Sequence, residues 1–417
     1  MMQESKQPNV LLSSSDIYCK PNSIGISRLR HYLRANNIPI TTIQNEADFI
    51  IINTCGFTKS YENLTFDLFS ECFKGKKPGC KVLAFGCLTT IKPEEIKVDF
   101  PELEMILDFS QLDKHLGVEI PYDSVKDSYL DDDIFEYIKE KHSLELLKNA
   151  AIFGLNLLEK LTENSKRPHI KALHISQIKE EYFSSNRTLV EIGSGCVSNC
   201  SYCIIKKAKG NPVSRPIDDI ISDIRKSYDP TKVVAFVATD CASYGVDIGE
   251  TLFSLVDRIN REFPGIVLDI TYINPLFLER HTDEYIEMFK KSNFDIVNVS
   301  LQSGSNKVIK TMNRHYNVEN ILALVKKLRA LSPRTMFYSH FIAGSPGETW
   351  GDFFKTLKAT RTFHYYNIFP FSPREGTKAA EMDNQNSRLI CNIRAAIGHA
   401  YLALGMLYRL VIPHRNN

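Results

Sequence analysis

The feature of this sequence that most restricts its fold is a sixfold alternation of strand-like runs with amphipathic helical segments after residue 188. The strand-like runs are residues 189–193, 233–240, 266–273, 296–302, 336–343 and 365–371. Such an alternation predicts a parallel, partly closed barrel, because each crossover helix returns the chain to begin the next strand in the same direction. In parallel βα folds the loops after the carboxyl ends of the strands face one cavity, so the chemistry is expected there.

A second α/β unit is predicted before this barrel. Residues 9–13, 48–53 and 81–85 have the composition of strands, and apolar residues recur at helical spacing between them, which predicts an open, mostly parallel sheet. The predicted fold class is therefore α/β, with four parts. They are an N-terminal open parallel domain at 1–115, a helical insertion at 116–187, a partial (βα)6 barrel at 188–382 and a C-terminal helical tail at 383–417.

Composition restricts the partners and the compartment. The chain has 51 Lys and Arg against 49 Asp and Glu, so a nucleic-acid substrate would need a local basic patch. The start is polar, without the apolar stretch of a signal peptide, and the late apolar run at 401–412 is too short to cross a bilayer. We therefore expect a cytoplasmic protein without a membrane partner. In a reducing cytosol, ten cysteines favour metal binding or redox chemistry over disulfides.

Three cysteines follow the first barrel strand at a defined spacing: Cys196, Cys200 and Cys203, hereafter the motif triad. Three such thiolates can hold a cubane 4Fe-4S cluster and leave its fourth iron without a protein ligand. That iron can chelate the amino and carboxylate groups of S-adenosylmethionine, so that an electron from the cluster releases a 5'-deoxyadenosyl radical. A zinc site is the alternative, but zinc normally takes four ligands, and no second Cys or His pair follows at short range.

Three further cysteines each lie just beyond a predicted strand of the first domain: Cys19, Cys55 and Cys87, hereafter the N-terminal triad. Because parallel strands end at one edge of a sheet, these thiolates can converge and hold a second cluster. Gly56 and Gly86 are expected to let the backbone approach the inorganic sulfides. Ordinary core packing is the alternative, since buried cysteines are common. Packing or an exposed thiol is our interpretation for four others: Cys72, Cys80, Cys241 and Cys391.

The motif triad, with the aromatic Tyr202 before its last cysteine, resembles the motif of the radical S-adenosylmethionine superfamily. Across both domains the chain resembles, more narrowly, the methylthiotransferases that modify a tRNA adenosine or a ribosomal-protein aspartate. Besides the cysteines, the matching segments are residues 47–55, 209–216, 244–247, 301–305, 312–314, 347–349 and 372–377.

The resemblance implies two 4Fe-4S clusters and S-adenosylmethionine as cofactors. The N-terminal triad would hold the cluster that carries sulfur, and the motif triad the cluster that generates the radical. One S-adenosylmethionine would methylate the carried sulfur, and another would yield the radical that takes hydrogen from an unactivated C–H bond. No catalytic side chain is assigned, but five residues are predicted to bind cofactor. They are Tyr202 of the motif, next to the adenine, and four residues at strand ends: Asp240, Asn274, Gln302 and Ser303. Arg374 is expected to meet an anionic group, Glu375 or another carboxylate.

The chain departs from the family pattern at three places. The helical insertion is longer than a simple interdomain linker. Tyr18 stands where the family usually has glycine, and the residues after Met382 predict a helix where family members have a small RNA-binding β-barrel, which we expect to be absent. A peptide, a protein side chain or a small metabolite is then the favoured acceptor, with tRNA also possible, and a flavodoxin or ferredoxin would donate electrons. Two alternatives remain. One is a radical enzyme of another reaction type that uses the N-terminal cluster for electron relay or substrate anchoring, and the other is a non-catalytic protein that binds clusters and S-adenosylmethionine.

Overall fold

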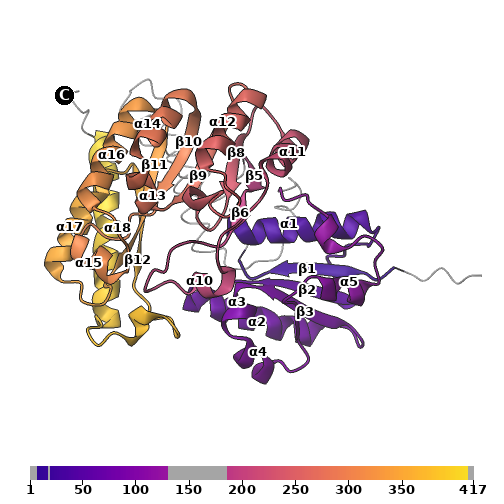
Figure 1. Ribbon diagram of the computed structural model, residues 1–417. Helices are drawn as coiled ribbons and strands as arrows, with labels where there is room; N and C mark the ends of the chain where they lie inside the picture. Colours follow the sequence, from indigo (N-terminus) through magenta and orange to yellow (C-terminus); the bar gives the residue numbers. More distant parts are fainter. Residues whose placement is uncertain (1–6, 17–18, 130–185, 412–417) are drawn as a thin grey trace, which may run out of the picture.

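The computed structural model describes residues 7–16, 19–129 and 186–411, and Figure 1 shows two α/β units joined side by side. Most of the predicted helical insertion, as well as Tyr18, lies outside the described residues. The predicted fold class is confirmed. Parallel sheets form both units, and a long C-terminal helix follows the second.

The N-terminal unit is a four-stranded parallel sheet in the order β1-β2-β3-β4. Its strands are β1 (Val10–Ser14), β2 (Phe49–Thr54), β3 (Lys81–Gly86) and β4 (Glu104–Met105). Its helices are α1 (Lys20–Ala35), α2 (Lys59–Gly75), α3 (Cys87–Ile91), α4 (Pro93–Asp99) and α5 (Ser110–Leu116). Strands β1 to β3 begin and end within one residue of the predicted runs. They are buried almost throughout because helices cover both faces of the sheet, as expected for a parallel sheet.

The second unit is a six-stranded parallel sheet in the order β12-β11-β10-β9-β8-β5. Its strands are β5 (Arg187–Glu191), β8 (Val233–Val237), β9 (Val267–Ile273), β10 (Asn293–Val299), β11 (Met336–Ala343) and β12 (Tyr365–Pro370). The six predicted strands are thus all present and neighbours in chain order. A short antiparallel pair, β6 (Gly193–Ser194) and β7 (Val213–Ser214), flanks the motif triad.

Helices alternate with these strands and cover one face of the curved sheet (Figure 1). The longer ones are α11 (Ile217–Ser227), α12 (Leu252–Glu262), α14 (Thr282–Lys291), α16 (Val318–Leu331), α17 (Trp350–Thr360) and α18 (Arg388–Val411). Three short ones lie in loops: α10 (Ile205–Lys209), α13 (Pro275–Arg280) and α15 (Asn306–Thr311).

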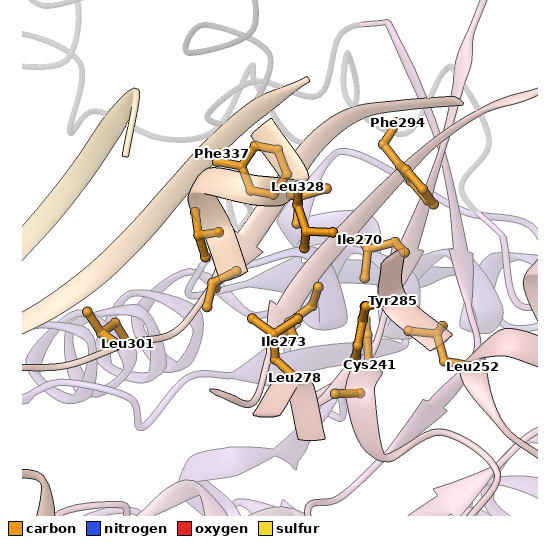
Figure 2. Close-up of a cluster of buried hydrophobic side chains, with 14 of the residues drawn as sticks. Cys241, Leu252, Ile270, Ile273, Leu278, Tyr285, Phe294, Leu301, Leu328 and Phe337 are labelled. Carbon is orange, nitrogen blue, oxygen red and sulfur yellow. The ribbon is translucent and has the colours of Figure 1, made fainter. Parts of the chain in front are cut away.

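The main core lies between this sheet and its helices. In α12 the buried residues Leu252, Leu255, Val256 and Ile259 follow helical spacing, so that one face of the helix is buried. Figure 2 shows Leu252 in the same cluster as Ile270 of β9 and Tyr285 of α14. Full burial of such a side chain contributes about 1.5–3 kcal/mol.

A second core joins the two units. Leu189 of β5 and Ala235 and Val237 of β8 pack with Ile24 and Ile26 of α1. Their neighbours in the strands belong to the main core on the opposite face, which is the alternation expected of a sheet covered on both sides. The apolar contact with α1 therefore holds the N-terminal unit against the β5–β8 side of the barrel sheet.

Helix α18 packs along β11 and β12. Tyr366 of β12 donates a hydrogen bond from its hydroxyl to the carbonyl of Gly398 at 2.7 Å, and Arg394 donates to the buried carboxyl group of Glu348 at 2.9 Å. Among the described residues, α18 alone has the length and apolarity of a membrane span, over Arg388–Tyr408, with 22% of its most apolar window buried. This stretch is longer than the 401–412 run taken from the sequence. Length and apolarity alone are also met by core helices of soluble proteins.

Candidate cluster and cofactor site

The motif triad lies on the loop between β6 and α10. Gly195 begins this loop with a φ of +74°, and a Cβ there would lie 1.9 Å from the carbonyl oxygen of Asn211, so only glycine fits. The amide of Ser198 donates to Cys196 Sγ at 3.3 Å, and the amide of Cys203 donates to the carbonyl of Cys200 at 3.1 Å. Cys200 raises the pKa of both Cys196 and Cys203 by its charge, so the three thiols of the motif triad are neighbours.

Burial disfavours the anionic form of the thiols in the motif triad. Burial raises the pKa of Cys196 to about 12, and nearby Asp240 adds to this increase, whereas the Ser198 amide opposes it. Burial also raises the pKa of Cys203, against the backbone amides of Lys206 and Ile205. Thiols in this environment stay protonated at neutral pH unless iron replaces the proton, because coordination to a metal cation deprotonates a thiol.

The N-terminal triad comes together at the carboxyl edge of the four-stranded sheet. Cys19 caps α1, Cys55 follows β2, and Cys87 opens α3 directly after β3. The three thiols interact electrostatically: Cys87 raises the pKa of Cys19, and both raise that of Cys55. Desolvation is the larger cause in each case, and it brings the pKa of Cys19 to about 12. The structure thus places the three cysteines together. That they bind iron stays a prediction.

Asp16 is a buried neighbour of this triad that sequence reasoning missed. Its carboxylate accepts from the amide of Cys19 at 3.2 Å and from the thiol of Cys55 at 3.6 Å. It also raises the pKa of Cys87, after burial and against the opposing charge of Lys209. The sequence feature that could have indicated this role is its position just after β1, three residues before Cys19.

Gly86 and Gly56 lie where protein atoms leave no room for a side chain. Gly86 has a φ of +112°, and a Cβ on it would lie 2.6 Å from the carbonyl oxygen of Thr54. At Gly56, a Cβ would lie 2.8 Å from the side chain of Ile91. These glycines therefore let β3 approach β2 and α3 approach the Cys55 loop. Close approach of their backbone to inorganic sulfide stays a prediction.

The donor atoms of both triads fit an iron-sulfur cluster. Backbone amides point at the sulfurs of Cys19, from Asn22, and of Cys55, from Phe57, and such bonds stabilise the anionic form. In the described part of the chain, no three His, Cys, Asp or Glu side chains are close enough to bind one metal ion. A cubane cluster separates its ligands more widely, because each cysteine binds a different iron atom.

Three of the predicted cofactor residues form one network beside the motif triad. Asn274 donates from Nδ2 to Ser198 Oγ at 2.7 Å and to Asp240 Oδ2 at 3.4 Å, and the thiol of Cys196 donates to the same Asp240 oxygen at 3.7 Å. Burial raises the pKa of Asp240, while the Asn274 side chain lowers it. Tyr202 joins this network through a further residue.

That residue is Arg314, which sequence reasoning placed in a matching segment but did not assign to the site. Its guanidinium donates to the hydroxyl of Tyr202 at 3.1 Å and to Oδ1 of Asn274 at 3.4 Å. It also lies 5.5 Å from the ring centre of Tyr316. Burial lowers the pKa of Arg314, but Tyr202, Tyr316 and Cys200 raise it above its ordinary value, so a buried positive charge persists next to the motif triad.

Gln302 and Ser303 lie in the loop after β10. Gln302 has a φ of +77°, and its amide donates to the carbonyl of His340 at 3.0 Å. The hydroxyl of Ser303 lies 3.1 Å from that of Thr356 and accepts from the amide of Ser305. These contacts hold the loop against β11 and α17. Binding of cofactor by either residue stays a prediction.

The two triads lie on elements that touch each other. Lys207 of α10 donates to the carbonyl of Ile91 in α3 at 3.1 Å, and Ile204 packs with Ile91 and Cys87. Lys209, at the end of α10, lowers the pKa of both Cys19 and Cys87 by its charge, although burial dominates at each. Lys209 of α10 thus places a positive charge near the N-terminal triad.

The four other cysteines are buried: Cys72, Cys80, Cys241 and Cys391. Arg374 meets a carboxylate, as expected, but that carboxylate is Glu62 of α2 and not Glu375.

Comparison with known proteins agrees with this arrangement. Residues 190–360 match the radical SAM superfamily, and residues 15–108 match the uncharacterized protein family UPF0004. The chain is 30% identical to the ribosomal protein uS12 methylthiotransferase RimO of Clostridium novyi, over 88% of this chain and 76% of that protein. It is 27% identical to the threonylcarbamoyladenosine tRNA methylthiotransferase of Danio rerio, over 87% and 61%.

Among solved structures, the radical S-adenosylmethionine methyltransferase TsrM of Kitasatospora setae is similar, with a TM-score of 0.53 and 12% identity over 90% of this chain and 77% of that one. At this identity the likeness concerns the fold alone.

Proposed function

This chain belongs to the radical S-adenosylmethionine methylthiotransferase family, and from that membership we propose that it inserts sulfur, as a methylthio group, into an unactivated C–H bond. The proposal includes two 4Fe-4S clusters, one on each cysteine triad. It also includes the domain limits given above, at residues 1–115, 116–187, 188–382 and 383–417. We place the enzyme in the cytoplasm, with a flavodoxin or ferredoxin as electron donor.

The observation that carries the proposal is the convergence of two thiol triads on elements in direct contact. When bound, the clusters would supply an electron for cleavage of S-adenosylmethionine and a carrier for the sulfur. The contact between α3 and α10 holds the two loops side by side. A substrate carbon activated at one triad must meet sulfur at the other before it is quenched, so the work of this chain is largely positioning and exclusion of water.

The network beside the motif triad would bind and orient S-adenosylmethionine. Arg314 offers a buried positive charge for a carboxylate, and Asp240 offers an acceptor for an ammonium or hydroxyl group. Asn274 bonds to both residues and would hold them at a fixed spacing. Tyr202 would provide an aromatic surface next to the cofactor.

We propose a protein side chain as the acceptor, with a tRNA nucleoside as the runner-up. The Clostridium novyi relative is named for ribosomal protein uS12, whereas the Danio rerio relative is named for a tRNA nucleoside. The chain's net charge of +2 supplies no general attraction to RNA. The higher identity to the relative named for uS12 and the low net charge of the chain both favour a protein acceptor.

The test compares tryptic peptides of uS12 and tRNA nucleosides from cells with and without this gene. The expected result is one species that loses a methylthio mass in the deletion strain. Purified anaerobically, the enzyme should release both 5'-deoxyadenosine and S-adenosylhomocysteine from S-adenosylmethionine. Release of 5'-deoxyadenosine without methyl transfer would favour another radical reaction, and cleavage of neither bond would favour a binding protein.

The cluster assignment has its own measurement. Cys19→Ala and Cys196→Ala should each remove the iron of one cluster and leave the other. A wild-type protein that carries one cluster, with the N-terminal triad free to alkylate, would contradict the sulfur-delivery assignment.

A further inference from the structure

One segment of the barrel touches both cysteine loops. Residues 371–379, hereafter the bridging segment, follow the last strand, β12. Arg374 donates from Nη2 to the carbonyl of Gly56, next to Cys55, at 2.7 Å. The amide of Ala379 donates to the carbonyl of Ser201, inside the motif triad, at 2.8 Å. A single short segment is thus bonded to a loop of each triad.

The contact with the N-terminal unit is a buried ion pair. Arg374 is 9% exposed and pairs with Glu62, which is 1% exposed. Lys59 and Lys92 also lie within 4 Å of Glu62, but both belong to the N-terminal unit itself. Arg374 is therefore the residue that ties this carboxylate, and with it the Cys55 loop, to the barrel.

The contact with the motif triad is fixed independently of Arg374. Phe371 and Ala379 pack together with Cys391 and with the ring of Tyr202. The backbone of the bridging segment is held by Thr377, whose hydroxyl donates to the carbonyl of Arg374 at 2.7 Å. Loss of the Arg374 side chain should thus leave the motif side of the segment in place.

We propose that Arg374 is a positioning residue that sets the separation of the two cluster sites and so couples radical formation to sulfur transfer. The inference rests on the proposed function, because coupling has meaning only if one triad activates the substrate and the other supplies sulfur. A guanidinium suits this role, because its Nη2 carries two N–H donors, one for the carbonyl of Gly56 and one for the carboxylate of Glu62. A small displacement of the Cys55 loop would leave each cluster intact but misplace the sulfur.

The test compares Arg374→Gln with wild type and with Arg187→Gln. Arg187 is also buried in ion pairs, with Asp269 and Asp295, but it lies at the amino ends of the barrel strands and so controls for loss of a buried charge pair. In Arg374→Gln we expect unchanged iron content and 5'-deoxyadenosine formation within about threefold of wild type. The yield of methylthiolated product per 5'-deoxyadenosine should fall by about tenfold or more, since misplacement of reacting groups by an ångström costs up to about 10²-fold.

The second readout does not depend on turnover. Magnetic dipolar coupling between the two reduced clusters, measured by electron paramagnetic resonance, should change in Arg374→Gln and stay as in wild type in Arg187→Gln. Arg374→Lys should give an intermediate product ratio, because lysine keeps the charge but carries it on a shorter side chain. If Arg374→Gln does not fold, Glu62→Gln removes the same ion pair from the other side and should change the coupling in the same way.

An unchanged product ratio together with unchanged dipolar coupling in Arg374→Gln would overturn the inference. So would an equal fall of the ratio in Arg187→Gln, since the effect would then follow from lost stability. Failure of the proposed function looks different. The wild type would form no methylthiolated product at all, and the dipolar coupling would still decide whether Arg374 sets the separation.

Discussion

Replacement of Gly86 by alanine should disrupt the N-terminal triad while the motif triad stays intact. Gly86 has φ +112° and ψ −159°, a region open essentially to glycine alone, so strain there costs about 1–3 kcal/mol. The added Cβ would also lie 2.6 Å from the carbonyl oxygen of Thr54 and 2.9 Å from its amide nitrogen. Overpacking of this kind costs about 1–3 kcal/mol more. The lower entropy of the unfolded chain returns only about 0.4–1 kcal/mol.

Gly79 provides a matched control. It too has a positive φ, +82°, but a Cβ there would meet nothing within 4 Å, so Gly79→Ala should cost only about 1–2 kcal/mol of local strain. Because Cys87 directly follows Gly86, the strain of Gly86→Ala acts next to a cysteine of the N-terminal triad. After anaerobic reconstitution, Gly86→Ala should fall from about eight to about four irons per chain, whereas Gly79→Ala should keep about eight. Equal iron content and equal melting temperatures in the two variants would refute this reasoning.

Three further predictions concern the barrel. Arg314→Gln should weaken S-adenosylmethionine binding by about 10- to 100-fold at unchanged iron content, because a charged hydrogen-bond donor contributes about 1.5–3 kcal/mol. Equilibrium binding to the reconstituted protein measures the affinity, and an unchanged affinity would contradict the prediction. Burial raises the pKa of Glu348 to about 7, so the folded protein keeps a proton that the unfolded chain loses above its ordinary value of 4.5. Stability should therefore fall from pH 5 to pH 8 relative to Glu348→Gln, as followed by thermal melting; parallel curves would exclude this. Gly195→Ala should lower the iron bound by the motif triad, because its Cβ would overlap Asn211; iron counting in a Cys19→Ala background tests it, and full occupancy would contradict it.

The order of the strands could be predicted because burial on both faces leaves a clear pattern. Strand β8 is a continuous apolar run between polar loops, and amphipathic helices such as α12 alternate with the strands. In a parallel sheet this order also fixes which strand ends are neighbours, so cysteines 30 or more residues apart could be placed together. The ends of the strands were less certain, since loop residues such as Ala238 are buried as well.

The site was predictable where residues follow a strand directly, and less so elsewhere. Asp240 and Asn274 lie at strand ends, and the structure brings both beside Cys196. Arg314 escaped assignment because it comes after α15, away from any strand end, and only the packing of α15 brings it to Tyr202. Asp16 is an exception, because it lies only two residues beyond β1 and was still not assigned to the site: it precedes the cysteine and is not part of the cysteine pattern.

The pairing of Arg374 with Glu62 could not be predicted at all, and the reason is general. The two residues are 312 positions apart and belong to different units, so neither helix nor strand periodicity relates them. Their contact depends on how α1 docks against β5 and β8, which follows from the summed packing of many side chains. Chemistry within one unit can thus be inferred from strand ends. The distance between two sites on different units is set by contacts that leave no local pattern, and in this chain the separation of the two cysteine triads depends on them.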